Sequence, residues 1–449
     1  MRQSKLIVKA CKHLAFSVCV LLAYAHPNLH AQQVEQPTNL SFRHIQQSKL
    51  EAIGYINAMT QDATGFMWFG GSNGLARYDG TQLKIYRTDE RDTNSLSHNN
   101  VYALLIDSQG NLWAGTRDGL NLYRPNTDSF TVFRQPHSNS SESPNDDIRS
   151  LLEDTKGHIW LGTRKGLYSF NPQEKTYNAY QLSTVVDSSM GDNIVWTITQ
   201  DQEGILWVGT RDYGISRFNL LTKLFHTYHL SNPQEPDKKF DDIRRLFVDS
   251  RNRVWAATYG GGIFIFDRTS DNFRPFDHAV HQEDKSPIIW DFLEDKEGNI
   301  WIADGRGLTL VNESKNHRSR FSHANNDPNS PGNFVPTRLH QDLAGDIWVG
   351  YFPSGIDLVD HQAAVFNNFT HQPSNPQSVS DGGVLSSWED KAGNLWVGAG
   401  YGLNYVDHTN GDISHTLYQP DNPKGLSGNT VLSILEDKQE TLWLGVWSG

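Results

Sequence analysis

The chain has 449 residues, 11% of them aromatic, with 13 Trp and 37 Gly, a composition that favours short strands and tight turns over long helices. Its formal net charge is −12, and residues 1–31 hold four basic side chains and no acidic one, so the remainder carries −12 − 4 = −16. Because nucleic acid binding needs a broad basic surface, this charge argues against nucleic acid as a partner.

Residues 1–31 have the pattern of a secretory signal peptide. Four basic residues precede the apolar run Leu14–Ala25, and small residues follow at its end and at Ala31. The run is shorter than the roughly 20 residues that span a bilayer, so we expect a cleaved signal and a periplasmic location. Cys11 and Cys19 are the only cysteines and lie inside this segment, so the exported chain would have neither a disulfide nor a thiolate metal site.

The rest of the chain repeats one pattern nine times. Each copy, for example Ile148–Asn171, has an apolar run, an Asp, a Gly three residues later, a Trp three residues after that, and then a Gly-Leu step. The tryptophans are Trp68, Trp113, Trp160, Trp207, Trp255, Trp301, Trp348, Trp396 and Trp443, with spacings of 45, 47, 47, 48, 46, 47, 48 and 47 residues. A fixed period of this length is typical of propellers and solenoids.

Each copy is predicted to form four strands. In the second copy these are residues 101–106, 111–116, 119–123 and 129–133, and the turn Asp107–Gly110 joins the first two. The turn Asp recurs as Asp62, Asp107, Asp154, Asp201, Asp249, Asp295, Asp342, Asp390 and Asp437. Asn252 and Glu440 replace the turn Gly in two copies. Four strands in every copy and no helical periodicity predict an all-β fold, a β-propeller of four-stranded blades.

Nine blades exceed the about four to eight of a usual ring, and the early segment Leu40–Ile45 suggests how they divide. Phe42 lies 26 residues before Trp68, which is the register of a fourth, outermost strand without a blade of its own. We expect this strand to complete the seventh blade, Val335–Asp360, and so to remove the open edge of a ring.

This prediction divides the chain into three parts. They are a signal peptide at 1–31, a seven-bladed propeller at 40–362, and an incomplete second propeller of two blades at 363–449, which would begin with the strand Ala364–Phe369. The last copy stops inside its second strand, soon after Trp443, so we expect the sequence to be a fragment of a longer protein.

The motif D-x-x-G-x-ϕ-W-ϕ-G-T-x-x-G-L, in which ϕ is apolar, resembles the two-component regulator propeller repeats. The segments Thr93–Ser97, Asn375–Ser380, Asn422–Ser427 and Gln61–Gly80 are also similar to that family. The resemblance implies the periplasmic sensor region of a membrane-bound signalling protein with two seven-bladed propellers. A small β-sandwich, a transmembrane helix and an output module would follow.

In this family the output module is commonly a histidine kinase, often a hybrid one, or a diguanylate cyclase. The sequence contains no kinase His box, no GGDEF stretch and no membrane span. By this resemblance the full-length protein would be a homodimer, and the chain would meet the inner membrane only through a downstream segment.

Candidate ligand-binding residues fall at two equivalent positions of successive blades. In a propeller, the loops between second and third strands share one face with the start of the first strands. The fourth residue after the Trp is Arg117, Arg164 or Arg211 in three successive blades. The second residue of the first strand is Arg149, Trp196, Arg244 or Trp290, and Tyr213, Tyr259, Phe352 and Tyr401 lie in later loops of the same face. Guanidinium groups and aromatic rings on one rim favour an anionic or neutral oligosaccharide as ligand. The alternative is that these residues are ordinary solvated or blade-packing side chains.

Other charged residues are expected to be structural. Arg245, Asp291 and Arg338 share one first-strand position in three successive blades, where they would line the channel and form ion pairs. The nine turn Asp residues indicate a backbone role, because no copy has the spacing of a calcium loop. We therefore expect neither a metal nor a cofactor.

Two other classes of function stay open. The first is a secreted enzyme acting on polysaccharide, because the Asp-x-x-Gly-x-x-Trp turn is similar to the Asp boxes of sialidases and less closely to the Trp motifs of quinone dehydrogenases. Both families fit less well than the regulator propeller, since the spacing differs from that of the quinone family and no arginine triad of the sialidase type is visible. An enzyme would need carboxylates or nucleophiles unique to one or two blades, and no such set is evident, so no catalytic residue is assigned. The third class is a protein-interaction scaffold.

Overall fold

The computed structural model describes residues 40–45, 50–135, 147–180, 194–232, 235–277, 288–325, 327, 329–359, 371, 377–409, 411–422 and 424–447. Apart from one short 3-10 helix, the regular elements of these residues are strands, mostly in four-stranded antiparallel sheets, so the predicted all-β fold is confirmed. The predicted signal peptide at 1–31 and the predicted strand at 364–369 lie outside the described residues. No helix in the described ranges is long and apolar enough to cross a membrane.

The first six sheets each follow one copy of the repeat. They are β2 (Ile56–Gln61), β3 (Met67–Gly71), β4 (Gly74–Tyr78) and β5 (Leu83–Tyr86); β6 (Val101–Ile106), β7 (Leu112–Thr116), β8 (Gly119–Arg124) and β9 (Ser129–Phe133); β10 (Ile148–Glu153), β11 (Ile159–Thr163), β12 (Gly166–Asn171) and β13 (Thr176–Tyr180); β14 (Val195–Gln200), β15 (Leu206–Thr210), β16 (Ile215–Phe218) and β17 (Phe225–Tyr228); β20 (Ile243–Val248), β21 (Val254–Thr258), β22 (Gly262–Asp267) and β23 (Asn272–Phe276); and β24 (Ile289–Glu294), β25 (Ile300–Asp304), β26 (Gly307–Asn312) and β27 (His317–Phe321).

The remaining elements complete the described chain. The seventh sheet contains β28 (Val335–Gln341), β29 (Ile347–Phe352), β30 (Ile356–Val359) and the early strand β1 (Phe42–His44). A further sheet contains β31 (Val384–Glu389), β32 (Leu395–Ala399), β33 (Gly402–Val406) and β34 (Ile413–Thr416), and β35 (Val431–Glu436) pairs with β36 (Leu442–Val446). A short 3-10 helix covers Glu51–Ile53, and β18 (Ser231–Asn232) pairs with β19 (Glu235–Lys239).

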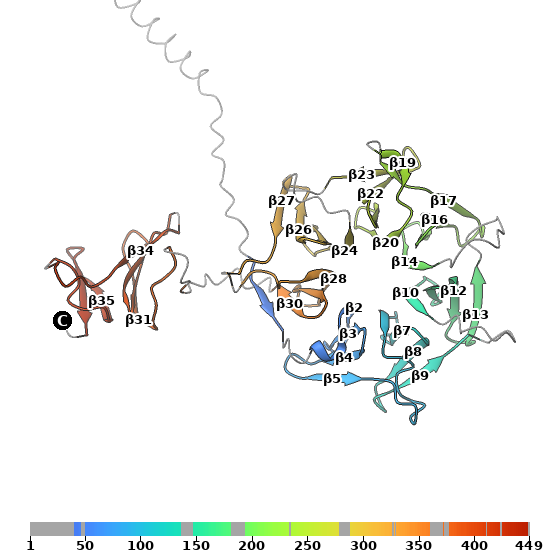
Figure 1. Ribbon diagram of the computed structural model, residues 1–449, viewed down its shortest axis with the longest axis horizontal. Helices are drawn as coiled ribbons and strands as arrows, with labels where there is room; N and C mark the ends of the chain where they lie inside the picture. Colours follow the sequence, from blue (N-terminus) through green and yellow to red (C-terminus); the bar gives the residue numbers. More distant parts are fainter. Residues whose placement is uncertain are drawn as a thin grey trace, which may run out of the picture. The chain divides into compact units, whose positions relative to one another are not determined.

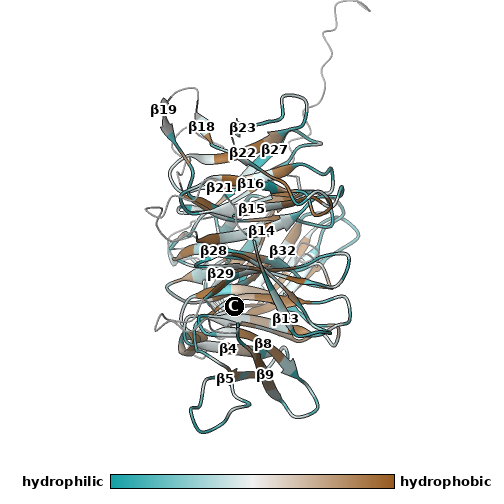
Figure 2. Ribbon diagram, turned by 90° about the vertical axis from the view of Figure 1, so that its right-hand side faces the viewer, coloured by the Kyte–Doolittle hydropathy of each residue, from teal (hydrophilic) through white to brown (hydrophobic). Residues whose placement is uncertain are grey.

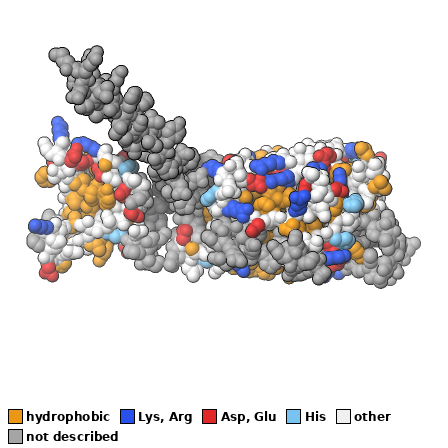
Figure 3. Space-filling model, turned by 90° about the horizontal axis from the view of Figure 1, so that it is seen from above, with side chains coloured by type: hydrophobic (Ala, Val, Ile, Leu, Met, Phe, Trp, Pro, Cys, Tyr) orange, Lys and Arg blue, Asp and Glu red, His pale blue; other side chains and the backbone are white. Residues whose placement is uncertain are grey.

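The first seven sheets form a closed ring (Figure 1). The first strand of each sheet is innermost and contacts the first strand of the next, in the order β2, β6, β10, β14, β20, β24, β28 and back to β2. Hydrophobic residues follow the strands, whereas the connecting loops are mostly hydrophilic (Figure 2). On the side drawn in Figure 3, Lys and Arg side chains are interspersed with Asp and Glu.

The early strand closes this ring, as its register predicted. β1 pairs antiparallel with β30, so that Phe42 lies opposite Val359 and His44 opposite Asp357. The Phe42 side chain is 2% exposed and packs in one cluster with Trp301, Tyr351 and Val359. Two ends of the ring, 313 residues apart at His44 and Asp357, are thereby joined by backbone hydrogen bonds. The division of the chain into one complete and one incomplete propeller stays a prediction.

The repeated Asp and Trp are joined directly. In all nine copies the Trp indole N–H donates to Oδ2 of the turn Asp, at 2.7–3.2 Å. Oδ1 of the same Asp accepts backbone N–H groups of the turn. In the second copy, for example, the backbone N–H groups of Gln109 and Asn111 donate to Oδ1 of Asp107. The predicted backbone role of the Asp is therefore confirmed, and the indole bond is an addition that the sequence reasoning missed. Asn252 and Glu440 adopt φ of +61° and +65° in place of Gly.

Small residues two positions after the Trp let neighbouring sheets approach closely. A Cβ added at Gly115 would lie 2.6 Å from Cγ2 of Ile148, on the next sheet. The same addition at Gly209 would lie 2.7 Å from Cγ2 of Ile243. A side chain here would push the sheets apart, so the spacing around the ring depends on this position.

Replacing the buried aromatic of the closing strand tests its role. We expect Phe42→Ala to lower the free energy of unfolding by about 3–5 kcal/mol, because a large buried side chain is lost where two ends of the ring meet. Chemical denaturation followed by tryptophan fluorescence measures the change. Arg43→Ala, at the exposed position beside it, serves as control and should change stability by less than about 0.5 kcal/mol. Equal effects of the two substitutions would contradict the closing role.

Removing one turn Asp tests the indole bond. Asp107→Ala leaves the buried Trp113 N–H and two turn amides without their acceptor, so we expect a loss of about 2 kcal/mol or more. Asp79→Ala is the matched control, since Asp79 also caps a turn through Thr81 and Gln82 but bonds no Trp. Thermal unfolding should separate the two variants, and a loss at Asp107 no greater than at Asp79 would refute the importance of the indole bond.

Candidate ligand-binding face

Every innermost strand of the ring has a β-bulge near its start. The pairing register with the second strand shifts at Ile56/Ala58, Val101/Ala103, Ile148/Ser150, Val195/Thr197, Ile243/Arg245, Ile289/Asp291 and Pro336/Arg338. A bulge leaves one residue unpaired and re-aims its side chain. We call these residues the bulge ring: Asn57, Tyr102, Arg149, Trp196, Arg244, Trp290 and Thr337. They lie at one end of the innermost strands, around the centre of the propeller.

Five side chains on this face form an arginine–aromatic stack, namely Tyr102, Arg149, Trp196, Arg244 and Tyr259. Cζ of Arg149 lies 3.9 Å from the ring centroid of Tyr102 and 5.3 Å from that of Trp196. Cζ of Arg244 lies 4.9 Å from the centroids of both Trp196 and Tyr259. Cation and ring thus alternate across successive blades at distances typical of cation–π attraction.

An aspartate just before the strand holds each arginine of the stack. Nη2 of Arg149 donates to Oδ2 of Asp147 at 2.7 Å, and Nη2 of Arg244 donates to Oδ2 of Asp242 at 2.7 Å. Burial raises the pKa of Asp242, and Arg244 opposes this rise. Burial likewise raises the pKa of Tyr102 against the effect of Arg149. The two arginines are therefore oriented and neutralised by partners from their own blades.

The same face gathers buried polar atoms that lack a hydrogen-bond partner. In the described ranges, six of the eight such side-chain atoms are here: Oδ1 of Asp147, Nε of Arg149, Nε1 of Trp196, Oδ1 of Asp242, Nε of Arg244 and Nε1 of Trp290. Buried polar groups are normally paired, so a cluster of this kind calls for an explanation. Two acceptors and four donors could serve a ligand rich in hydroxyl groups, because a hydroxyl both donates and accepts.

The candidate residues from the sequence fall into two groups. Arg149, Trp196, Arg244 and Trp290 all belong to the bulge ring, and Tyr259 joins the arginine–aromatic stack. Arg117, Arg164, Arg211 and Tyr213 lie in the loops between second and third strands, outside the stack.

These loops are on the expected face, because their backbones bond the segments that lead into the innermost strands. The N–H of Arg117 donates to O of Asn100, that of Arg164 to O of Asp147, and that of Arg211 to O of Ile194. The Arg211 and Asp212 side chains are exposed and 4.0 Å apart.

The charged residues deeper in the channel pair only in part as predicted. Nε of Arg245 donates to Oδ1 of Asp291 at 2.7 Å, which confirms that ion pair. Arg338 donates instead to the carbonyl oxygens of Asn57 and Thr337. Burial lowers the pKa of Arg338 to about 10, opposed by Asp291. Asp291 also accepts the Leu339 N–H at 3.0 Å, so it links neighbouring blades.

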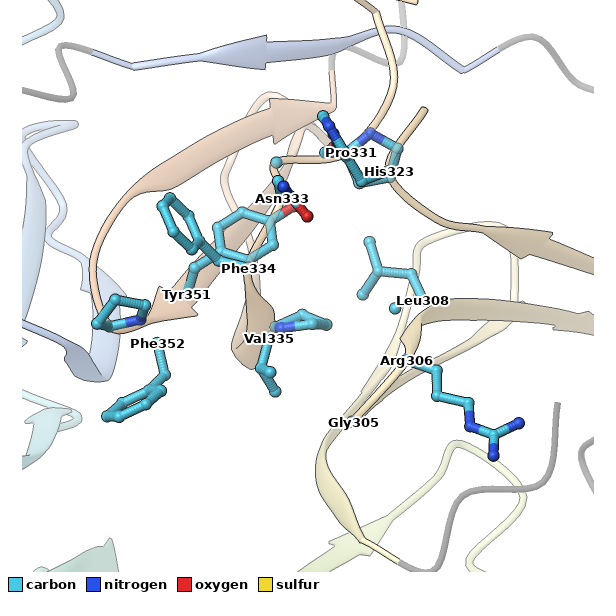
Figure 4. Close-up of a pocket in the computed structure, with 14 residues that line it drawn as sticks. Gly305, Arg306, Leu308, His323, Pro331, Asn333, Phe334, Val335, Tyr351 and Phe352 are labelled. Atoms are coloured by element: carbon cyan, nitrogen blue, oxygen red, sulfur yellow. Dashed lines mark hydrogen bonds between the residues drawn. The ribbon is translucent and has the colours of Figure 1, made fainter. Parts of the chain in front are cut away.

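The sequence reasoning missed a pocket on the same face, between the sixth and seventh sheets (Figure 4). Its volume is 430 Å³, and its lining comes from the β25–β26 turn, the segment before β28 and the β29–β30 turn. Of its lining, only Phe352 was singled out from the sequence. The two turns occupy the repeated position between second and third strands, but the segment before β28 that brings Phe334 to them does not repeat, so the period gave no signal for the pocket. Among the described residues no group of three or more His, Cys, Asp or Glu is placed to hold a metal ion.

Comparison with known families gives matches at four places. The model of the two component regulator propeller repeat matches residues 95–118, 142–165, 189–212 and 425–448. Each match covers the turn with the repeated Asp and the strand with the repeated Trp, and ends shortly after this Trp. No curated protein matches the chain.

Solved structures similar to this chain include two extracellular domains from B. thetaiotaomicron. One is from BT3049, assigned as a hybrid two component system, with 24% identity and a TM-score of 0.65 over 88% of this chain and 50% of that one. The other is from BT4673, assigned likewise, with 20% identity and a TM-score of 0.57 over 91% of this chain and 51% of that one. Virginiamycin B lyase from Staphylococcus aureus has 13% identity and a TM-score of 0.54 over 71% of this chain and 98% of its own. The chain thus spans about half the length of the two domains.

A buried histidine in the channel gives a pH-dependent prediction. Nε2 of His340 is buried without a hydrogen-bond partner, and burial lowers the pKa of His340 below 6.5, opposed by Asp342 and Asp291. Below pH 6.5 the unfolded chain therefore binds this proton more readily than the folded chain, so stability falls as the pH drops through this value. We expect His340→Leu to lose less thermal stability than the unsubstituted chain between pH 7 and pH 5.

Thr199→Leu provides the matched control, because Thr199 lies opposite Trp207 as His340 lies opposite Trp348. It should keep the pH dependence of the unsubstituted chain. An unchanged pH dependence in His340→Leu would contradict the assignment of this proton to His340.

Proposed function

We propose that this chain, which is built of two component regulator propeller repeats, is the ligand-sensing region of a signalling protein and acts in the periplasm. The repeats matched by the family model and the likeness in fold to extracellular domains of B. thetaiotaomicron support the sensor role. The signal-peptide pattern of residues 1–31 supports export. In this proposal a membrane-bound output module follows, a hybrid histidine kinase or alternatively a diguanylate cyclase, and the whole protein is a homodimer.

The observation that carries the ligand proposal is the arginine–aromatic stack together with the six unpaired buried atoms on the same face. Sugar hydroxyls can donate to Asp147 and Asp242 and accept from the arginine and indole N–H groups. The apolar faces of sugar rings can pack on the edges of Tyr102, Trp196 and Tyr259. An oligosaccharide therefore fits this face better than a small compact ion.

The charge of the stack favours a neutral sugar. Arg149 and Arg244 are each paired with an aspartate, so these four side chains sum to zero. The outer loops add Arg117, Arg164 and Arg211, which would contact the acid groups of a longer, acidic oligosaccharide. Binding of the sugar can produce a signal only if two conformations of the sensor differ in their affinity for it.

One observation favours an enzyme acting on polysaccharide as the second candidate. Asp242 has a raised pKa and an unpaired Oδ1, which are properties of a general acid, and Asp147 offers a second carboxyl on the same face. If so, bound oligosaccharide would be cleaved, whereas a sensor releases it intact.

Titration of the purified chain with oligosaccharides tests the proposal. Cello-, xylo- and laminari-oligosaccharides serve as neutral ligands and oligogalacturonate as an acidic one, with calorimetry for binding and chromatography for cleavage. We expect saturable binding without cleavage, and Trp196→Ala to weaken it at least about tenfold, because the Trp196 ring contacts both arginines of the stack. Joint replacement of Arg164 and Arg211 by Ala should weaken only an acidic ligand.

Tyr418→Ala is the control, since Tyr418 is an exposed aromatic outside the ring. It should leave affinity unchanged. Unaltered affinity in both Trp196→Ala and the double arginine variant would refute this binding face, and cleavage lost in Asp242→Asn would establish the enzyme instead. A stop codon directly after Gly449 in the gene would refute a fused output module.

A further inference from the structure

The pocket between the sixth and seventh sheets is separate from the arginine–aromatic stack. None of its lining residues belongs to the stack. A smaller cavity of 230 Å³ adjoins it and shares His323, Gly332, Asn333, Phe334 and Tyr351 with it. The two together extend from the start of β28 outward to His44 on the closing strand β1. Their combined size suits a small molecule.

The wall that the smaller cavity adds contains Asp357, whose carboxylate is already paired. The carboxylate of Asp357 accepts from the Tyr351 hydroxyl at 2.7 Å and the Gly332 N–H at 2.8 Å. Its other oxygen lies 2.5 Å from Nδ1 of His44. Asp357 is 2% exposed, so its carboxylate interacts with groups of the protein itself and not with a ligand. Because His44 comes from β1, this wall is complete only when the ring is closed.

The mouth of the pocket is unusually apolar. Phe334 is 38% exposed and Phe352 is 51% exposed, and both line the pocket with Leu308 and Val335 (Figure 4). Large exposed aromatics beside a concave surface often mark a binding site. They offer a surface on which the ring or branched chain of a ligand would be buried.

A single cation accompanies this apolar surface. Arg306 is exposed, and its backbone N–H donates to Oδ1 of Asp304 at 2.8 Å. Both carboxylate oxygens of Asp304 are bound by Arg320, at 2.7 and 2.8 Å, so Asp304 does not neutralise Arg306. Within the described residues the Arg306 guanidinium forms no ion pair.

We propose that this pocket is a second binding site, which takes a small carboxylic acid with an apolar body. The body packs against Phe334, Phe352 and Leu308, and the carboxylate pairs with Arg306. The apolar contacts alone would bind a neutral molecule equally well, so the unneutralised arginine is what selects an anion. The site goes beyond the oligosaccharide face and acts independently of it.

Calorimetric titration with 3-phenylpropionate, and with its uncharged amide as the matched ligand, tests the site. We expect the acid to bind about tenfold more tightly than the amide, and Arg306→Gln to abolish that difference. Phe334→Ala should weaken both ligands alike. Arg91→Gln is the control, because Arg91 is exposed and pairs only with its neighbour Asp89.

The outcomes separate this site from the oligosaccharide face. Trp196→Ala should leave 3-phenylpropionate binding unchanged, and Arg306→Gln should leave oligosaccharide binding unchanged. Absence of saturable binding of the acid, equal affinity for acid and amide, or an Arg306→Gln variant that still prefers the acid would each overturn the proposal. Failure of oligosaccharide binding alone would leave it standing.

Discussion

The antiparallel pairing of β1 with β30 is the constraint on which the rest of the ring depends. Without it the seventh sheet would end in an unpaired β30, and the first and seventh sheets would be joined only through packing and side-chain hydrogen bonds such as that from Arg338 to the Asn57 carbonyl. The pairing also delivers Phe42 to the core between the sixth and seventh sheets. On the other side of the closure, Phe69 and Trp348 pack with their ring centroids 5.7 Å apart. A strand of three residues therefore fixes the positions of all seven innermost strands.

Fixed spacing is what turns separate side chains into a surface. The bond between indole and turn Asp holds each sheet in one shape, and the glycine after the Trp sets how near the next sheet lies. Innermost strands that contact their neighbours then bring bulge residues of adjacent sheets within 3.9–5.3 Å of one another's rings or guanidinium groups. A looser ring would lose these contacts first, because cation–π attraction falls away beyond about 6 Å.

Repetition explains which features the sequence could predict. The Trp period predicted the blades, and the register of Phe42 predicted the closing strand, because both are relations between copies. The indole bond was also within reach, since Asp and Trp are six residues apart in every copy. The β-bulges could not be foreseen, because one residue added to a strand leaves the period unchanged. Arg338 was wrongly expected to join an ion pair, since sequence does not reveal that the carbonyl groups of Asn57 and Thr337 lie beside it. The pocket escaped notice because Arg306 in the β25–β26 turn, Phe334 before β28 and Tyr351 near the end of β29 meet only in the folded chain.

Residues that repeat and residues that do not thus have different tasks. The repeated Asp, Gly and Trp satisfy their own hydrogen bonds and packing, and leave nothing for a ligand. Arg149, Trp196, Arg244 and Trp290 of the bulge ring retain unpaired buried donors, and Asp147 and Asp242 beside them retain unpaired buried acceptors, a cost that a folded protein rarely retains without use. The stack compensates its arginines with Asp147 and Asp242, whereas Arg306 stands uncompensated beside exposed aromatics. The same ring therefore presents two chemically distinct surfaces, one suited to hydroxyl groups and one to an apolar anion, and a single closing strand maintains the spacing that both require.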